Sequence, residues 1–514
     1  MFSNLEGTCE DDGEVVLTMV STLEDTAQQE TYSRVCGALV QQVVDSGGNA
    51  QEVLATIRQF DILSRQEEEL HAAAVAAAKA KELGSFKGND VFREVPVSQA
   101  EGHKKIQTLW VIKWKPLTTE EVKEAEKSGR QAVRKIKARL TIKGCQDPDK
   151  DLLDTESPTA TTMSQRLVFF EAAQRPDWCL EAWDISSAFL LGDKYSPADK
   201  RTIYVRPPAD VCKPGTVWEL LKAAYGLNDA PRRWNARLKK ALLKFGLTEN
   251  PLDPCSYTLF KSTDGEPRPE LFLTTHVDDL LLTGSKRVVR ELQAFLEKEF
   301  GQLTIEKEVF THLGCEVSRA ADGTVKVTQK LYAENVKAIP LTMDRRKRDM
   351  EDVTEEEREL LMSGVGSLAW TARMVRPDLS CTVSHLQSAS SKAQVRHLKE
   401  FNKAVKKLKD YEPDAVLTFC KLQAPYTIQA IADAGFANTE SQKSQAGQMI
   451  RICEAGKGPG RKGCLLEWRS RPLRRVVRST LGAETLSMVE AVDLAIHLGD
   501  IHLDILTSDP RAPR

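Results

Sequence analysis

Two adjacent aspartates, Asp278 and Asp279, are the residues whose types and spacing point most directly to chemistry. They lie in the stretch TTHVDDLLLTG, residues 274–284, between two apolar runs. Such runs on either side of a short polar break predict the strands and turn of a β-hairpin. Neighbouring carboxylates are costly to desolvate unless a cation or a hydrogen-bond donor compensates them, and a divalent metal ion does so naturally. The alternative is that the pair only caps a turn, the more common situation for two aspartates in a loop.

A third acid follows a strand-like run elsewhere in the chain. Asp184 lies in LEAWDISSAFLLGD, residues 180–193, before a second apolar stretch. If the two strands share a sheet, Asp184 meets Asp278 and the two carboxylates can share two magnesium ions about 3.5–4 Å apart. That arrangement stabilises both the attacking and the leaving oxygen in phosphoryl transfer.

The context of these acids resembles the reverse transcriptase of copia-type LTR retrotransposons, in which a strand, a VDD turn and a second strand form the polymerase hairpin. Matching blocks occur in the same order and at similar spacing from residue 85 to 335, with a weaker match at 364–409. They are KARLTIKG (137–144), ESPTA (156–160), WDISSAFLLGD (183–193), IYVRPPAD (203–210), AAYGLNDAPRRWN (223–235), DPCSY (253–257), HVDDLLLTG (276–284), HLGCEV (312–317) and VTQKLY (327–332).

The resemblance implies a role for each acid. Asp184 and Asp278 become ligands of both magnesium ions, with Mn²⁺ as an alternative metal, and Asp279 becomes the supporting carboxylate. One metal lowers the pKa of the primer 3'-hydroxyl, and the other neutralises the departing pyrophosphate. One departure accompanies the match: the primer-proximal residue before VDD is His276, where the family usually has tyrosine. We expect altered rather than abolished geometry there.

The resemblance also implies a nucleotide pocket. Phe189 stands where an aromatic ring blocks a ribose 2'-hydroxyl, although ordinary core packing is its alternative. Tyr225 and Gly226 belong to the turn that shapes the pocket, and Arg139 and Lys143 stand where basic residues hold the triphosphate. Five basic residues are candidates for contacts with the template backbone, although a helix with one charged face is equally ordinary; they are Arg232, Arg233, Arg237, Lys239 and Lys240.

The C-terminal stretch resembles a shortened copia-type ribonuclease H region. It carries IADAGFANTESQKSQAGQMI from residue 431, and its Ala483-Glu484 pair opens a predicted helix. Asp433 and Glu484 are then two of the four acids that hold two metals, and Asp509 is a weak candidate for a third, better explained as a frayed terminus. We expect this region alone not to cut RNA efficiently. A basic run is a candidate for contact with a heteroduplex backbone: Arg469, Arg471, Arg474, Arg475 and Arg478.

The composition and the charge distribution limit the class of protein to which these residues belong. The 514 residues are 41% hydrophobic and 28% charged, typical of globular proteins, and no apolar run is long enough to span a membrane. The eleven cysteines show no metal-ligand or disulfide spacing. Residues 1–80 carry 14 acidic and four basic side chains, so the remaining chain has a net charge of +8. We therefore expect a soluble intracellular protein, with a basic body that can attract phosphates.

Four stretches are predicted. Residues 1–85 form an acidic, helical N-terminal extension; residues 86–335 form reverse transcriptase fingers and palm; residues 336–425 form a helical thumb or connection; residues 426–514 form a truncated RNase H-like domain. The fold class is α+β, a right-hand polymerase followed by an incomplete RNase H-like α/β appendage. No long Gly/Ser-rich or Pro-rich linker separates the stretches.

Three functional hypotheses remain open at this point. The first is an RNA-directed DNA polymerase of a retrotransposon Pol polyprotein. Its partners would be an RNA template, a DNA primer, RNA/DNA hybrid and deoxynucleoside triphosphates, with a dimer or other Pol products as further candidates. Its location would be cytoplasmic, with virus-like particles and the nucleus as further sites. The second is a decayed or co-opted remnant that only binds nucleic acid. The third is a host interaction protein built around residues 1–85.

Overall fold

The computed structural model describes the backbone of strands β1 (Leu5–Cys9) and β2 (Val15–Met19) and residues 62–116, 134–199, 201–263, 266–410, 416–456 and 461–507. Internal contacts divide the chain into two compact units. Unit 1 takes in residues 158–186 and those from 240 onward, and unit 2 takes in residues 4–157 and 187–239. The predicted fingers-and-palm stretch, residues 86–335, therefore contributes to both units.

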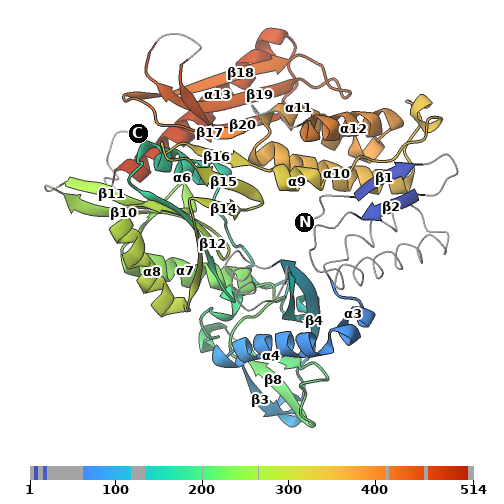
Figure 1. Ribbon diagram of the computed structural model, residues 1–514, viewed down its shortest axis with the longest axis vertical. Helices are drawn as coiled ribbons and strands as arrows, with labels where there is room; N and C mark the ends of the chain where they lie inside the picture. Colours follow the sequence, from blue (N-terminus) through green and yellow to red (C-terminus); the bar gives the residue numbers. More distant parts are fainter. Residues whose placement is uncertain are drawn as a thin grey trace. The chain divides into compact units, whose positions relative to one another are not determined.

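Unit 2 is built on a five-stranded sheet in the order β3-β8-β7-β4-β5, in which only β4 and β7 run parallel. Helix α4 packs on this sheet through Val75 and Phe86 (Figure 1). The elements are α3 (Arg65–Leu70), α4 (Ala72–Gly88), β3 (Phe92–Pro96), η1 (Val97–Ala100), β4 (Lys105–Pro116), β5 (Arg134–Ile142), η2 (Gly144–Gln146), η3 (Ala188–Leu190), η4 (Pro197–Asp199), β7 (Ile203–Arg206) and β8 (Thr216–Leu220).

The N-terminal extension differs from its prediction in two ways. Residues 5–9 and 15–19 pair as antiparallel strands, so the prediction of helix is wrong there. The second strand, VVLTM, is rich in β-branched and apolar residues, which favour a strand over a helix. The alanine-rich segment is helical as expected, but α4 continues past residue 85 to Gly88 and buries Phe86 in the unit 2 core. Residues 62–88 are therefore part of unit 2 rather than a separate leader.

Unit 1 contains a six-stranded antiparallel sheet in the order β13-β6-β12-β11-β10-β9. Helix α8 packs against it with one apolar face, because its buried residues, from Val288 to Phe300, recur at helical spacing. The elements here are α6 (Thr162–Gln174), β6 (Cys179–Ile185), α7 (Ala230–Phe245), which begins in unit 2, β9 (Thr248–Asn250), β10 (Asp253–Thr263), β11 (Glu266–His276), β12 (Asp279–Gly284), α8 (Lys286–Phe300) and β13 (Leu303–Lys307).

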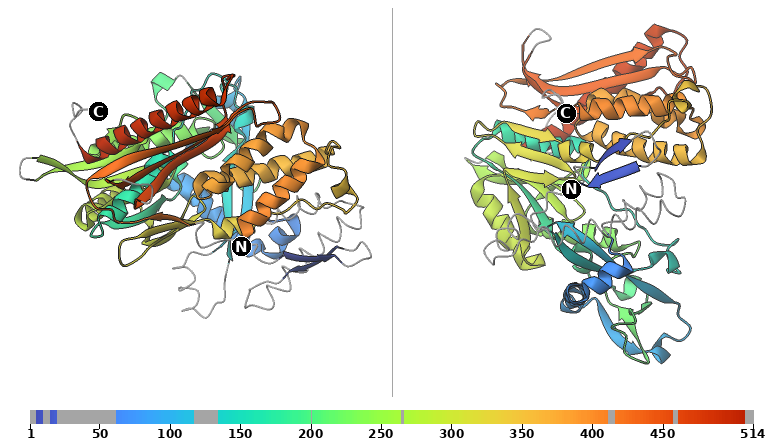
Figure 2. Two further views of the ribbon diagram at one scale, coloured as in Figure 1. Left: turned by 90° about the horizontal axis from the view of Figure 1, so that it is seen from above. Right: turned by 45° about the vertical axis from the view of Figure 1, so that its right-hand side comes forward.

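Two smaller sheets and a group of helices complete unit 1. One sheet has the order β14-β15-β16-β17, and the other has the order β18-β19-β20 with helix α13 packed along it (Figure 2). The elements are β14 (Val309–His312), β15 (Cys315–Arg319), β16 (Val325–Thr328), α9 (Lys330–Glu334), η5 (Arg345–Lys347), α10 (Glu355–Met374), η6 (Pro377–Leu379), α11 (Ser380–Ala389), η7 (Ser390–Lys392), α12 (Val395–Lys409), β17 (Leu417–Phe419), β18 (Tyr426–Gly435), β19 (Gln445–Glu454), β20 (Gly463–Pro472) and α13 (Thr480–Leu506).

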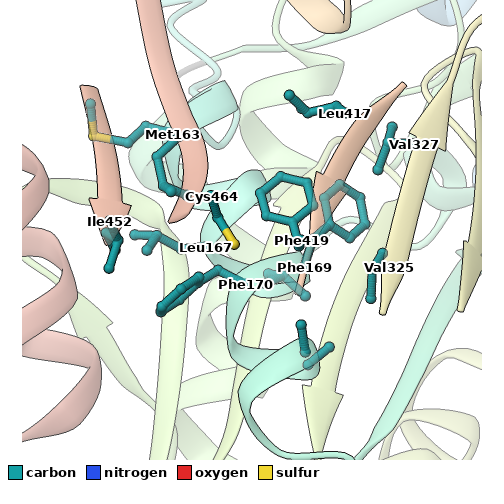
Figure 3. Close-up of a cluster of buried hydrophobic side chains, with 14 of the residues drawn as sticks. Met163, Leu167, Phe169, Phe170, Val325, Val327, Leu417, Phe419, Ile452 and Cys464 are labelled. Carbon is teal, nitrogen blue, oxygen red and sulfur yellow. The ribbon is translucent and has the colours of Figure 1, made fainter. Parts of the chain in front are cut away.

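Helix α6 lies at the centre of the unit 1 core. Eleven of its 13 residues are buried, so the helix is covered all round rather than on one face. Figure 3 shows Leu167 and Phe170 of α6 in one cluster with Phe419 of β17, Ile452 of β19 and Cys464 of β20. The predicted RNase H-like appendage therefore shares its core with α6, because a helix that is buried on all sides needs a second layer to cover it.

The helical stretch 336–425 contains α10, α11 and α12, which bury a separate cluster including Leu368, Leu386 and Phe401. Thr354 and Glu357 form a reciprocal capping box at the start of α10. Among the residues that the structure describes, no helix is both long and apolar enough to cross a membrane.

Two buried histidines predict a stability loss in acid. Burial lowers the pKa of His312 and of His502 to about 4, below the ordinary value of 6.5. Their neutral forms stabilise the fold fully above about pH 6.5, and this contribution is lost as pH falls toward 4. We expect the urea midpoint to fall steeply across this window, as followed by fluorescence.

His502→Gln tests this assignment. Nε2 of His502 lies 2.7 Å from Glu171 Oε1, and a glutamine amide can donate the same hydrogen bond without titrating. The variant should match the wild type near pH 7.5 and lose less stability at pH 5. An identical pH dependence in both proteins would contradict the assignment.

Candidate active site

Three aspartates lie at one end of the central strands of unit 1. Strands β12 and β6 are antiparallel neighbours, and their register sets Asp279 directly opposite Asp184. The Ile185 amide donates to the Asp278 carbonyl at 3.1 Å, which holds the turn residue against the end of β6. The predicted hairpin is confirmed, with β11 ending at His276 and β12 beginning at Asp279. Long-range pairing thus brings together residues almost 100 positions apart.

The turn between these strands is tight. Val277 has a φ of +60°, which is rare for a β-branched residue and costs about 1–3 kcal/mol. Asp184, Asp278 and Asp279 are all half-buried, so their oxygens are reachable from solvent. A strained turn beside three accessible carboxylates is typical of a functional site.

The donor set suits a hard divalent cation. Carboxylate oxygens are the ligands that Mg²⁺ prefers, and like charges directly opposite on neighbouring strands destabilise a sheet unless they are compensated. In the described part of the chain, no group of three or more His, Cys, Asp or Glu side chains is close enough to form a ready metal site. The facing pair Asp184 and Asp279, with Asp278 in the adjoining turn, supplies oxygen ligands of the kind that Mg²⁺ prefers.

His276 lies opposite Asp279 on the hairpin and is half-buried. Burial lowers its pKa, and the negative charge of Asp278 only partly opposes this effect. The imidazole is therefore neutral near pH 7 and keeps an aromatic plane with a polar tip. Within the described residues its Nδ1 has no hydrogen-bond partner.

The aromatic and basic residues predicted for a nucleotide pocket gather in unit 2. The ring centroids of Phe189 and Tyr225 are 5.6 Å apart in an edge-on arrangement. The Arg139 guanidinium carbon lies 4.2 Å from the centroid of the Tyr225 ring, within cation–π range. Lys143 donates from Nζ to Gln107 at 3.0 Å. The structure thus brings Arg139, Phe189 and Tyr225 into one cluster, while their roles toward a nucleotide stay predictions.

Gly226 permits the closest approach in this cluster. The Ile142 amide donates to the Tyr225 carbonyl at 2.8 Å, so the turn packs directly on the end of β5. Gly226 has a φ of +91°, and a Cβ atom there would lie 2.1 Å from the Ile142 carbonyl oxygen. Only glycine combines this backbone conformation with such contact.

Gly226→Ala is expected to lower the melting temperature of unit 2 by several degrees, because the turn must move away from β5. Gly215→Ala is the matched control. Gly215 also has a positive φ, +73°, but a Cβ atom there would meet nothing within 4 Å. If both variants behave alike, backbone strain rather than the contact with Ile142 is responsible.

The two described candidates of the RNase H-like region lie near one another in unit 1. Asp433 is exposed on β18, and Glu484 is the fifth residue of α13, just after its first turn. Ser487, about one turn after Glu484, donates to the Asp433 carbonyl at 2.9 Å. Asp509 lies outside the described residues. The described chain therefore supplies two of the four acids that the resemblance implies.

Several basic residues predicted to follow nucleic acid make ion pairs instead. Arg233 bonds to Asp229 and Asp199, Arg232 lies 2.9 Å from Asp154, and Arg237 lies 3.5 Å from Asp193. In the C-terminal run, Arg469 and Arg471 lie 3.8 and 3.2 Å from Glu467 and Glu490. Arg474, Arg475 and Arg478 are exposed in the loop before α13. Much of the predicted basic surface is thus neutralised by neighbouring acids.

Sequence reasoning missed Arg201, whose side chain is 3% exposed and lies among three aspartates of unit 2. The partners Asp147 and Asp229 are 54 and 28 residues away along the chain. No local pattern marks such a residue, because neither hydrophobic periodicity nor a motif describes a buried charge paired at long range.

Comparison with known proteins gives a consistent picture. The family profile described as "Reverse transcriptase (RNA-dependent DNA polymerase)" matches residues 89–346, about half of the chain. The Pol polyprotein from transposon RE2 of Arabidopsis thaliana is 28% identical over 376 residues, covering 70% of this chain and 24% of that protein. The Pol polyprotein from transposon TNT 1-94 of Nicotiana tabacum is 24% identical over 442 residues, covering 80% and 30%. The chain spans about a quarter of the length of these relatives.

Among solved structures, the foamy viral protease-reverse transcriptase in complex with RNA/DNA hybrid aligns with a TM-score of 0.39 at 12% identity, over 70% of this chain and 42% of that one. A second structure of that enzyme, in complex with double-stranded DNA, gives a TM-score of 0.42 at 13% identity, over 94% and 75%.

Proposed function

Because the chain belongs to the reverse transcriptase (RNA-dependent DNA polymerase) family, we propose that it is an RNA-directed DNA polymerase that adds deoxynucleotides to a primer 3'-hydroxyl. One observation carries the proposal. The strand register sets Asp279 opposite Asp184, and Asp278 lies in the adjoining turn, directly after the strained Val277. Phosphoryl transfer needs such a set of carboxylates to hold divalent cations.

The proposed role of each residue is the one that the family resemblance implies. Asp184 and Asp278 would hold the metal ions, two Mg²⁺ or Mn²⁺, and Asp279 would support them from the facing strand. When bound, the metals would activate the primer hydroxyl and stabilise the charge that develops on the pyrophosphate. His276, neutral near pH 7, would offer a planar ring beside the primer without adding charge. The proposed nucleic-acid partners are an RNA template with its DNA primer, and RNA/DNA hybrid.

Unit 2 would bind the incoming deoxynucleoside triphosphate. Arg139 and Lys143 would contact phosphate oxygens, for which guanidinium and ammonium groups are well suited. The Tyr225 ring, covered by Arg139 on its face, would present a rigid wall to the base or sugar. We further propose a cytoplasmic location with access to virus-like particles and the nucleus, and association with a second copy or with other Pol products.

The test is incorporation of labelled dTTP on poly(rA)/oligo(dT) by the purified chain, with and without Mg²⁺. Metal-dependent extension of the primer, visible as a ladder of longer products, supports the proposal. If the folded chain binds the duplex but extends no primer, the alternative proposal of a nucleic-acid-binding remnant is favoured. Incubation of a labelled RNA/DNA hybrid in the same buffer should show little RNA cleavage, because the described region supplies only Asp433 and Glu484.

Phe189 predicts selectivity for deoxyribose. If its ring excludes a 2'-hydroxyl, Phe189→Val should raise the relative efficiency of rUTP over dTTP incorporation by about tenfold or more, a differential of about 1.4 kcal/mol. The measurement is the ratio of kcat/KM for the two nucleotides. A lower rate with both nucleotides and an unchanged ratio would identify Phe189 as a packing residue against Tyr225.

A further inference from the structure

Arg201 is a buried cation that joins two loops of unit 2. Its side chain is 3% exposed, and one terminal nitrogen bonds to Asp147, whose side chain is 1% exposed. The other terminal nitrogen lies 3.2 Å from Asp229, which is 5% exposed. The third nitrogen, Nε, lies 3.8 Å from Asp149. The planar fork of arginine is thus shared between carboxylates from different segments.

The two loops are those that carry the nucleotide-pocket residues. Asp147 follows Lys143 by four residues, and Asp229 follows Gly226 by three. The loops also touch, because a Cβ atom on Gly144 would lie 2.2 Å from the Gly226 carbonyl oxygen. Backbone packing sets the loops side by side, and Arg201 bonds to one carboxylate beside each of them.

Among the three aspartates, Asp229 makes the largest number of these polar contacts. Besides Arg201, it accepts hydrogen bonds from Arg233 Nε at 2.9 Å and from the Tyr195 hydroxyl at 3.3 Å. Arg233 also bonds to Asp199. Removing one partner of a buried ion pair is strongly unfavourable, because it leaves the other charge without compensation.

We propose that Arg201 is a positioning residue for the deoxynucleotide pocket, holding the Lys143 loop and the Tyr225–Gly226 turn in one geometry through Asp147 and Asp229. The inference rests on the proposed function. The Arg201 side chain is only 3% exposed and its two terminal nitrogens bond to Asp147 and Asp229, so it acts through the residues that it joins. Displacement of a binding group by about 1 Å can lower the rate up to a hundredfold, so a residue that fixes the position of binding groups can affect activity strongly.

The test compares Arg201→Lys, which keeps the charge but loses the fork, with Asp229→Asn, which removes one carboxylate and leaves Arg201 in place. Arg93→Lys is the matched control, because Arg93 makes a forked ion pair with Glu219 in the same unit but is 58% exposed. Steady-state kinetics would give KM for dTTP and kcat. Anisotropy would give the Kd for a labelled RNA/DNA duplex, and thermal melting would show the folded fraction.

Positioning predicts that both site variants raise the KM for dTTP about tenfold, while the duplex Kd and the control stay unchanged. A purely structural role would lower the melting temperature and the apparent kcat with KM unchanged, and that result would overturn the proposal. Using two variants covers the case in which Arg201→Lys fails to fold, since Asp229→Asn then decides the question.

Binding of a fluorescent deoxynucleotide to the chain–duplex complex in Ca²⁺ separates this inference from the proposed function. If the wild type binds nucleotide in Ca²⁺ but extends no primer in Mg²⁺, the proposed function fails, and weaker binding by the two variants still supports positioning. Equal binding by wild type and variants, or no binding by the wild type, overturns the inference.

Discussion

Replacing Asp278 by asparagine is expected to lower magnesium-dependent deoxynucleotide incorporation about a thousandfold or more. An amide oxygen is a weaker ligand than a carboxylate, and removal of one group that stabilises developing charge costs about 10²–10³ in rate even without a metal. The expected result applies to kcat, measured by single-turnover primer extension. Asp279→Asn should cause a smaller loss, since the resemblance gives Asp279 the supporting role.

Folding should not suffer from this change. Asp184, Asp278 and Asp279 carry like charges at one end of β6 and β12, so neutralising one of them relieves repulsion when no metal is bound. The melting temperature without Mg²⁺ should stay the same or rise. Asp322→Asn is the control, because Asp322 is an exposed turn residue of the same unit whose carboxylate accepts from the Thr324 amide at 2.9 Å. Full activity in Asp278→Asn would remove Asp278 from the catalytic site.

The second large effect is expected at Arg166. This residue of α6 is 5% exposed and lies 3.2 Å from Glu467 of β20, which is 1% exposed. Its guanidinium carbon lies 3.7 Å from the Trp468 ring centroid, and it donates to the Leu466 carbonyl at 2.8 Å. Burial lowers its pKa to about 10, so the side chain is still charged at neutral pH. Arg166→Met should destabilise unit 1 by about 3 kcal/mol, because Glu467 loses its buried cation and keeps the partly exposed Arg373 at 2.5 Å.

Urea unfolding of full-length variants measures this effect. Arg166→Met with Glu467→Leu should recover part of the loss, since it removes both charges of the pair. Arg358→Met, which breaks the exposed 2.8 Å pair with Glu355 on α10, should cost less than about 1 kcal/mol. If Arg166→Met unfolds no more easily than Arg358→Met, the contact between α6 and β20 does not stabilise the unit.

The size of this loss would show how much the C-terminal region contributes to the stability of unit 1. Strands β19 and β20 and helix α13 bury apolar side chains in the same cluster as α6 of the palm, and the Arg166–Glu467 pair spans this contact. A loss of several kcal/mol is a large share of the stability of any domain. Residues 417–506 would then support the polymerase fold even if Asp433 and Glu484 never cut RNA.

Local patterns were sufficient for the polymerase hairpin and for most regular elements. Two apolar runs flank the polar turn at Asp278 and Asp279, and this short pattern predicted a hairpin. The pairing of β11 with β12 confirms it. Helices such as α8 and α12 carry their buried face in their own spacing. The acidic residues of the site lie within these short segments, so a resemblance of ordered motifs identified them before any contact was known.

The sequence by itself thus determined the family, the α+β class and the acids that are candidates for metal binding. Only the tertiary structure decided which charges are buried and what they touch: Arg201 among Asp147 and Asp229, and Arg166 against Glu467 from 301 residues away. It also placed the C-terminal strands in the palm core. The physical reason is that the cost of burying a charge or an apolar face depends on partners far along the chain, which no local periodicity contains.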